Sequence, residues 1–209
     1  MDNGSMKELV EKLEMGEITP KDTVKILQES GLTEKAILKG GAWSYLLWVI
    51  PCFLPGFAKL TGLEILRVFA ELPRMHFPST VIYLSILLFI AAIPLTASGM
   101  YFNVKKGGCR TEDHTVILIK DGPYKIVRHP SNVAWSIFFV MLPISLSQYV
   151  PFTILSVFGI VTIVAFSYYA SLIEERELDL KKWGDEYREY MEEVPRWNLF
   201  KGLWNLGKK

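Results

Sequence analysis

Three long apolar runs without a single charged residue constrain this chain more than any other feature. They cover Gly40–Ala58, Phe77–Val104 and Pro130–Ile173. A helix needs about 20 mostly apolar residues to cross a bilayer, and each run is close to that length or exceeds it. With 50% hydrophobic residues and a mean hydropathy of +0.24, the chain is too apolar for an ordinary soluble domain. We therefore expect an all-α, multi-pass helical membrane protein.

The spacing of these runs predicts about four spans. The third run is long enough for two spans, and the Gln148–Pro151 segment supplies a break because proline cannot continue a helix without losing a hydrogen bond. Spans three and four should then form a tight hairpin. Pro51 and Pro55 interrupt the first span, so a kinked or re-entrant segment is the alternative there. The predicted spans are approximately Ala42–Phe57, Thr80–Phe102, Val133–Ser147 and Phe152–Ile173.

The distribution of Lys and Arg predicts the topology, because positive charge favours the cytoplasmic side. Residues 1–39 contain six Lys, Lys105–Arg128 contains six Lys or Arg, and the tail from Glu174 contains eight. Lys59–His76 contains only three. Both termini and the Lys105–Arg128 loop are therefore expected to be cytoplasmic. The net charge of +1 does not indicate a nucleic-acid partner, and the His and Cys spacing does not predict a metal site.

Residues 1–39 are predicted to form a soluble helical hairpin ahead of a membrane domain that covers residues 40–209. Gly16 should end the first helix, and Thr19 and Pro20 have the residue types that begin a second one. We expect this hairpin to serve in attachment or oligomer contact, and the sequence does not fix the oligomeric state.

The loop between spans two and three is long for a protein of this size, and long ordered loops are usually functional. It contains the apolar, β-like stretch Thr115–Lys120, followed by Asp121 and Gly122, which signal a turn. The loop should therefore fold back on the bundle, where it would either seal the helices or form the wall of a pocket.

Charged residues flank the predicted hairpin of spans three and four. Arg128 and His129 precede span three, and Glu174 and Glu175 follow span four directly. Antiparallel neighbouring helices would bring these groups and Tyr124 to one end of the bundle. Basic, aromatic and acidic groups at one depth favour a site for a zwitterionic ligand. Taken separately, each pair is better explained as charge that marks a membrane boundary.

The segments "GPYKIVRHPSNVAW" and "EERELDLKKWGDEYREYMEEVPR" resemble the isoprenylcysteine carboxyl methyltransferase family and the wider group of membrane methyltransferases that includes phospholipid N-methyltransferases. The shared pattern is a G-x-Y turn, R-H-P, two close spans, an acidic pair and a G-x-E-Y-x-x-Y segment, in that order. It covers about Asp121 to Arg196. Asn132 and Ala134 stand where carboxyl methyltransferases often have Tyr and Gly, which concerns substrate identity more than cofactor use.

The resemblance implies S-adenosylmethionine as cofactor, bound in a cytoplasmic pocket without a Rossmann fold; the sequence contains no glycine-rich phosphate motif. Either acidic residue of the pair would hold the cofactor ammonium, and the basic and aromatic groups would hold its carboxylate or ribose. Arg196 would place a carboxylate nucleophile, and Glu175 would be the base for an amine nucleophile. The residues assigned to the cofactor are Tyr124, Arg128, His129, Pro130, Glu174 and Glu175.

The implied substrate is lipidic or prenylated and enters from the bilayer, with farnesylcysteine-like carboxylates as a model. One alternative is a sterol-type membrane reductase that uses reduced nicotinamide dinucleotide phosphate. Such reductases share R-H-P and a V-P-x-R ending but commonly carry Asp where this chain has Trp135, which favours the methyltransferase. The other alternative is a noncatalytic helical membrane protein, in which Glu174, Glu175 and His129 would tolerate neutral replacement.

Overall fold

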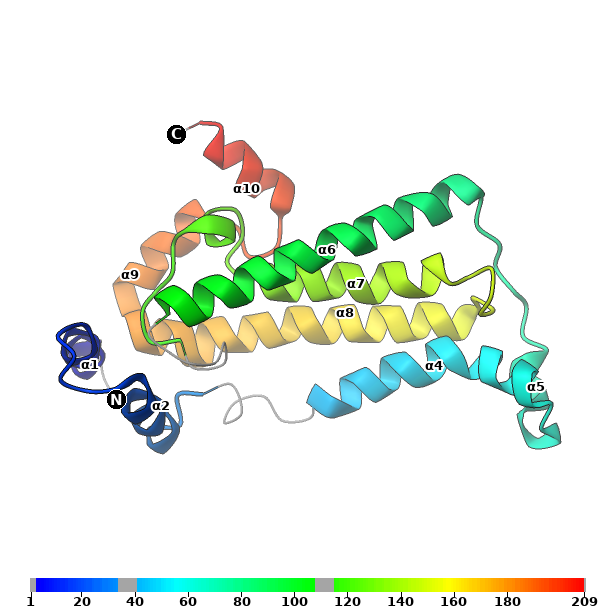
Figure 1. Cartoon of the computed structure of the whole chain (residues 1–209), viewed down its shortest axis with the longest axis horizontal. Coiled ribbons are helices and arrows are strands. Elements are labelled where there is room, and N and C mark those ends of the chain that lie inside the picture. Colours follow the sequence, from blue (N-terminus) through cyan, green and yellow to red (C-terminus); the bar gives the residue numbers. More distant parts are fainter. Residues whose placement is uncertain (1–2, 34–40, 108–114, 209) are drawn as a thin grey trace. The chain divides into compact units, whose positions relative to one another are not determined.

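The structure is a computed structural model that describes residues 3–33, 41–107 and 115–208. All regular secondary structure in these residues is helical, which confirms the all-α prediction for the described part (Figure 1). The chain divides into two compact units. One contains residues 1–39, 95–133 and 169–209, and the other contains residues 40–94 and 134–168. Three helices, α6 (Ser79–Lys106), α7 (Pro130–Ser145) and α8 (Ile154–Glu174), contribute residues to both units.

The unit of residues 40–94 and 134–168 is organised around Trp48 of α4 (Gly41–Thr61). The Trp48 indole donates to the Phe139 carbonyl at 3.0 Å, and the two rings pack edge to face with centroids 4.8 Å apart. Ile163 of α8 completes this buried cluster. At Gly159 a Cβ atom would lie 3.0 Å from the Trp48 carbonyl oxygen, so glycine permits α4 and α8 to approach closely.

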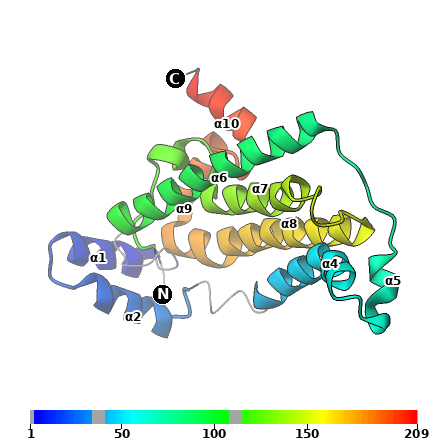
Figure 2. The ribbon, with the colours of Figure 1, turned by 45° about the vertical axis from the view of Figure 1, so that its right-hand side comes forward.

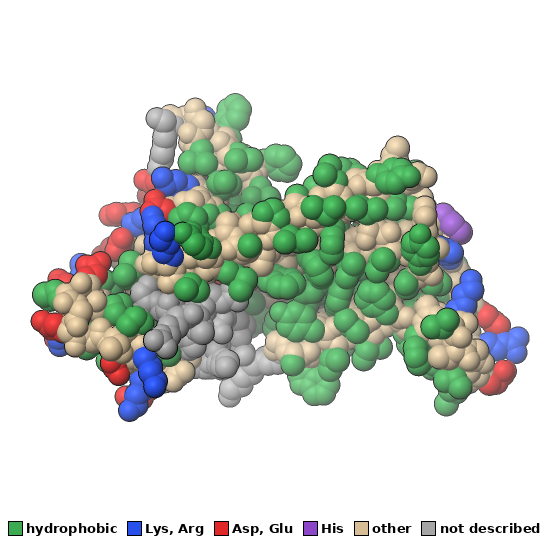
Figure 3. All heavy atoms as spheres, viewed as in Figure 1, with side chains coloured by type: hydrophobic (Ala, Val, Ile, Leu, Met, Phe, Trp, Pro, Cys, Tyr) green, Lys and Arg blue, Asp and Glu red, His purple; other side chains and the backbone are tan. Residues whose placement is uncertain are grey.

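Within the described residues, three helical stretches are long and apolar enough to cross a membrane: α4, α6 and the continuous stretch that begins with α8. Charge in this last stretch starts at Glu174, so its apolar part ends at Ile173. The helix α7 has 16 residues and is shorter than the usual span of about 20. Figure 3 shows hydrophobic side chains over the outward faces of α4 and α6, where Leu60 and Tyr83 are strongly exposed. Such faces suit contact with lipid.

The two predicted N-terminal helices are present as α1 (Asn3–Glu14) and α2 (Pro20–Glu29). A capping box begins α2, since the Thr19 hydroxyl accepts from the Asp22 amide at 3.2 Å and the Asp22 carboxylate accepts from the Thr19 amide at 3.2 Å. The predicted start of the second helix is therefore confirmed. Buried residues of this hairpin share a hydrophobic core with residues far along the chain: Met6, Leu9, Leu27, Leu32, Val116 and Leu178.

The expected β-like structure of Thr115–Lys120 is wrong, because the described residues contain no strand that could pair with it. The segment folds back all the same. The Val116 side chain is buried, its amide donates to the Gly107 carbonyl at 2.8 Å, and its carbonyl accepts from the Trp183 indole at 2.8 Å. Thr115–Lys120 has residues that favour extended backbone, but it forms no strand and is held instead by the hydrogen bonds of Val116 to Gly107 and Trp183. Residues 108–114 of this loop lie outside the described part.

The C-terminal part continues from α8 through a π-helical turn, η4 (Glu175–Asp179), into α9 (Leu180–Glu193) (Figures 1 and 2). Gly184 interrupts α9 with φ 49° and ψ −120°, a conformation that glycine adopts readily because it has no Cβ atom. The last helix is α10 (Leu199–Leu206). The short helices of the connections are η1 (Glu64–Leu66), α5 (Arg67–Ala70) and η3 (Gly122–Lys125).

We predict that Leu27→Ala loosens the hairpin by about 2–5 kcal/mol, because Leu27 is fully buried and its removal leaves a cavity. Hydrogen exchange of the α1 amides should show this loss in the free energy of opening. Met15→Ala is the matched control, because Met15 is exposed and its replacement should change that free energy by less than about 0.5 kcal/mol. Unchanged exchange in Leu27→Ala would contradict the assigned core.

Candidate functional site

The R-H-P segment is positioned by the chain that follows α9. The Arg128 amide donates to the Pro195 carbonyl at 3.1 Å, and the His129 amide donates to the Arg196 carbonyl at 3.4 Å. Pro130 is then the first residue of α7, where its missing N–H has no helical partner to lose. Two motifs separated by more than sixty residues are thus held side by side by main-chain hydrogen bonds.

The acidic side of the cluster comes from the junction of α8 and η4. Glu174 ends α8, and Glu175 to Asp179 form the π-helical turn. Hydrogen bonds in a π-turn reach five residues instead of four, and such turns are frequent at functional sites. Here the turn lets Glu174, Glu175 and Asp179 all act on one group, the His129 ring.

The Glu175 carboxylate is buried and contacts three cationic side chains. Its Oε1 accepts from Arg128 Nε at 2.9 Å and lies 3.1 Å from His129 Nε2. Its Oε2 accepts from Arg196 Nε at 2.9 Å and from Arg196 Nη2 at 2.6 Å. Arg128 Nη1 also donates to the carbonyls of Met191 and Val194. Both oxygens of Glu175 are therefore engaged within the protein.

Glu174 has a different environment from its neighbour. Its Oε2 lies 3.3 Å from His129 Nδ1, and its side chain is 24% exposed, whereas the Glu175 side chain is 3% exposed. The Arg196 side chain is 22% exposed. The charged cluster is therefore closed around Glu175 and opens to its surroundings at Glu174 and Arg196.

The pKa values follow from these contacts. Burial alone would raise the pKa of Glu175, but the hydrogen bonds from His129, Arg196 and Arg128 outweigh it and hold this pKa well below its ordinary range. Burial would likewise lower the pKa of His129, but Glu174 and Glu175 outweigh it and raise that pKa to about 10. At neutral pH Glu175 is thus ionised and the His129 ring is protonated.

Asp179 is the titratable group of this cluster that the sequence did not single out. Burial, together with the nearby Glu174 carboxylate, raises the pKa of Asp179 to about 7, and Tyr187 is hydrogen-bonded to it. The signal that points to Asp179 is its place five residues after Glu174, which becomes meaningful only once the π-turn is known.

Two of the other predicted residues have mainly positioning contacts. The Tyr124 hydroxyl donates to Asn103 Oδ1 of α6 at 2.6 Å, and the Tyr124 carbonyl accepts from the Tyr190 hydroxyl at 2.6 Å. Pro130 is buried at the start of α7. The structure therefore brings together Arg128, His129, Glu174, Glu175 and Arg196. The Tyr124 hydroxyl is instead hydrogen-bonded to Asn103 of α6.

Ser171 of α8 and Trp197, which precedes α10, are two polar residues that the sequence analysis did not single out, and they join Asn132 of α7. Ser171 Oγ accepts from Asn132 Nδ2 at 2.9 Å and from the Trp197 indole at 3.0 Å. Asn132 occupies one of the two positions at which the chain departs from the motif of the carboxyl methyltransferases. Its amide thus ties α7 to α8 directly beside the charged cluster.

No protein-family model matches this chain, and comparisons with curated proteins and with solved structures return no match. Within the described residues, no group of three or more His, Cys, Asp or Glu side chains is arranged to hold a metal ion. The chemistry of the cluster therefore has to be inferred from its own charges and contacts.

We predict that Glu175→Gln destabilises the protein by about 3–5 kcal/mol, because the change leaves buried cations without their counter-charge. For a chain of this size this corresponds to a fall of roughly 6–20 °C in the midpoint of thermal unfolding in detergent. Glu192→Gln is the control, since Glu192 is exposed on α9. A midpoint for Glu175→Gln that equals the control would show that the cluster does not hold the fold.

Proposed function

We propose that this chain is an integral membrane methyltransferase that transfers a methyl group from S-adenosylmethionine to a lipidic substrate. The observation that supports this most is the charge arrangement at the open edge of the cluster. Glu174 offers a partly exposed carboxylate and Arg196 a partly exposed guanidinium, on either side of the buried His129–Glu175 pair. An edge of this kind has a place for an ammonium group and a place for a carboxylate group.

The contacts support Glu174, and not Glu175, as the residue that binds the cofactor ammonium. Both Glu175 oxygens already accept hydrogen bonds from basic side chains, so a further cation would have to displace one of them. Among these ion pairs, Glu174 takes part only in the longer one, in which its Oε2 lies 3.3 Å from His129 Nδ1. In this proposal Glu175 and Arg128 are positioning residues that hold His129 and Arg196 in place.

The same electrostatics favour a carboxylate nucleophile over an amine. An amine substrate needs a base to take up its proton, and a base works best when its pKa lies near the working pH. The pKa of Glu175 is held well below its ordinary range, so Glu175 is a poor proton acceptor. A carboxylate needs only a cation that places it in line with the sulfonium methyl group, and Arg196 can supply that cation.

The apolar helices support a lipidic substrate. The hydrophobic faces of α4 and α6 are broadly exposed (Figure 3). Trp135 of α7 is also exposed, one turn after the R-H-P segment. A substrate with a long apolar chain would reach the cluster along such surfaces while its polar end met Arg196. The excess of Lys and Arg near both termini and in the loop after α6 favours the cytoplasmic side for the cluster.

Calorimetric titration of S-adenosylmethionine into the detergent-purified chain tests this proposal. We expect saturable binding in the micromolar range. Glu174→Gln should weaken it roughly tenfold or more, because a hydrogen bond to a charged group contributes about 1.5–3 kcal/mol. Glu192→Gln, on the exposed face of α9, should bind like the unmodified chain.

Reduced nicotinamide dinucleotide phosphate is the comparison ligand. Saturable binding of this dinucleotide in place of S-adenosylmethionine would move the chain to the reductase class. Binding of neither ligand by folded protein would favour the noncatalytic alternative, in which the cluster serves only the structure.

A further inference from the structure

The last helix, α10, has a docked side that faces the protein. Asn205 Nδ2 donates to the Glu193 carbonyl at 3.0 Å, and a Cβ atom at Gly202 would collide with the Ile126 carbonyl oxygen. Glycine at this position therefore lets the α10 backbone lie directly on the chain that leads into the R-H-P segment. All of these residues belong to one compact unit.

The outer side of α10 carries an apolar stripe that is strongly exposed. Phe200, Leu203 and Trp204 have the i, i+3, i+4 spacing of one helix face, and they are 87%, 55% and 68% exposed. Since successive residues of a helix are about 100° apart, this stripe lies opposite Gly202 and Asn205. Figure 3 shows hydrophobic side chains at the surface of this helix, which is red in Figure 1. An exposed apolar stripe of this kind marks an interaction surface.

The charge beside the apolar stripe is of one sign. Lys201 and Lys208 are exposed and stand about two helical turns apart, so they share one edge of α10. Lys208 Nζ lies 5.3 Å from the centroid of the Trp204 ring. The segment 194–209 contains no Asp or Glu, and Glu193 of α9 meets α10 on its docked side. The outer side thus combines apolar side chains with positive charge.

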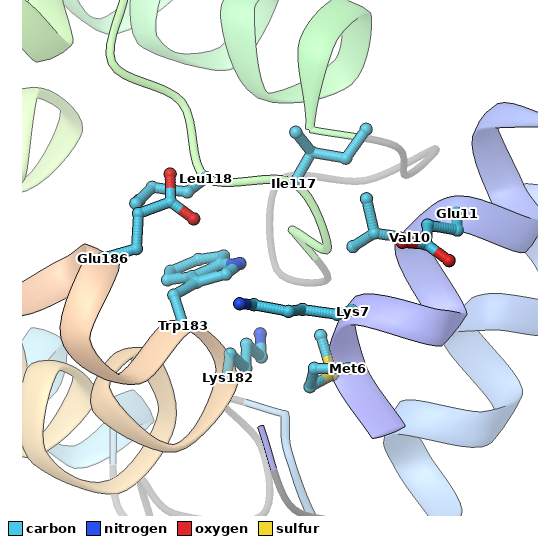
Figure 4. Close-up of a pocket in the computed structure, with 9 residues that line it drawn as sticks. All are labelled: Met6, Lys7, Val10, Glu11, Ile117, Leu118, Lys182, Trp183 and Glu186. Atoms are coloured by element: carbon cyan, nitrogen blue, oxygen red, sulfur yellow. The ribbon is translucent and has the colours of Figure 1, made fainter. Parts of the chain in front are cut away.

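The cavity between α1 and α9 in the same unit has a different charge pattern. This cavity of about 210 Å³ is lined by two lysines and two glutamates, namely Lys7, Lys182, Glu11 and Glu186 (Figure 4). Charges of both signs balance there and do not select an anionic partner. The outer side of α10 does select one, because its lysines have no acidic neighbours along the helix.

The docked side also places α10 close to the level at which the chain enters the bilayer. Ile126 precedes Pro130 by four residues, and the charge-free run of α7 and α8 begins at Pro130. Trp is enriched at such boundaries, because its amphipathic ring suits the headgroup region. A helix with Trp, Phe and Leu on one face and Lys on its polar side has the composition of helices that lie in the interface.

A second copy of this chain fits the apolar stripe less well than lipid does. Two copies that met through this face would bring their lysines together, and like charges repel. The helix has eight residues and is therefore only about 12 Å long, whereas a stable interface buries about 800 Å² of each partner. Anionic headgroups instead attract lysines that lie near the membrane surface.

We propose that α10 is an interfacial helix that binds an anionic lipid surface, with its apolar stripe among the upper acyl chains and Lys201 and Lys208 at the phosphate groups. Lipid bound there would press α10 onto Ile126 and so hold the chain that leads into the R-H-P segment. This proposal depends on the membrane assignment and not on methyl transfer, so it stands whether or not S-adenosylmethionine binds.

A bimane label at Leu203→Cys tests this proposal in the full chain, with Cys52 and Cys109 replaced by Ser. The chain is reconstituted in vesicles of phosphatidylcholine and phosphatidylserine at one fixed ratio, and the same amount of either lipid carries bromine on its acyl chains to quench the label. We expect brominated phosphatidylserine to quench at least about twofold more strongly than brominated phosphatidylcholine, because the lysines gather anionic lipid around α10. A label at Met15→Cys is the matched control and should be quenched by neither lipid, since Met15 is 65% exposed on the N-terminal hairpin.

Removal of the two charges tests the role of the lysines. Lys201→Gln combined with Lys208→Gln should abolish the preference for brominated phosphatidylserine, whereas Lys21→Gln combined with Lys25→Gln, on the exposed surface of α2, should leave it unchanged. Equal quenching by both lipids would overturn the inference, because α10 would then not select anionic lipid. Absence of quenching by either lipid would overturn it as well, and a cross-link between two copies through the introduced cysteine would then assign the stripe to a second copy.

Discussion

The contact of the buried Glu175 carboxylate with Arg128, His129 and Arg196 is the interaction on which the described site depends. The three cationic side chains come from the start of α7 and from the segment after α9, and the carboxylate comes from the turn after α8. A carboxylate in such a place would be very costly alone, as would each cation. The set is stable only when complete, so it fixes where these segments meet.

Adjacent positions in one sequence motif can therefore have separate tasks. Glu174 and Glu175 are neighbours, yet one is partly exposed at the edge of the cluster and the other is enclosed by basic groups. The π-turn explains this difference, because it begins between the two residues and changes the direction of everything that follows. In our proposal the enclosed residue organises the site, and the open one binds the ligand.

Much of the fold could be predicted from local signals. The charge-free runs correctly located α4, α6, α7 and α8, and the Thr19–Asp22 pattern correctly marked the start of α2. The expected β-like structure of Thr115–Lys120 was wrong. A strand needs a second strand to pair with, and the sequence of one segment does not show whether such a partner exists. Convergence of the basic and acidic motifs could be anticipated from helix order. Which cation meets which oxygen could not, because it depends on the π-turn and on the pairing of Arg128 and His129 with Pro195 and Arg196.

The protonation state of His129 tests the central claim most directly, because the buried ion cluster requires a charged imidazole. ¹⁵N-labelled histidine would be followed by NMR from pH 5 to 11, and substitution of His76 and His114 by Gln would assign the three histidine signals. The account predicts that the His129 ring keeps its proton at pH 8 and loses it near pH 10. Loss of the proton near the ordinary value of about 6.5 would show that Glu174 and Glu175 do not enclose it.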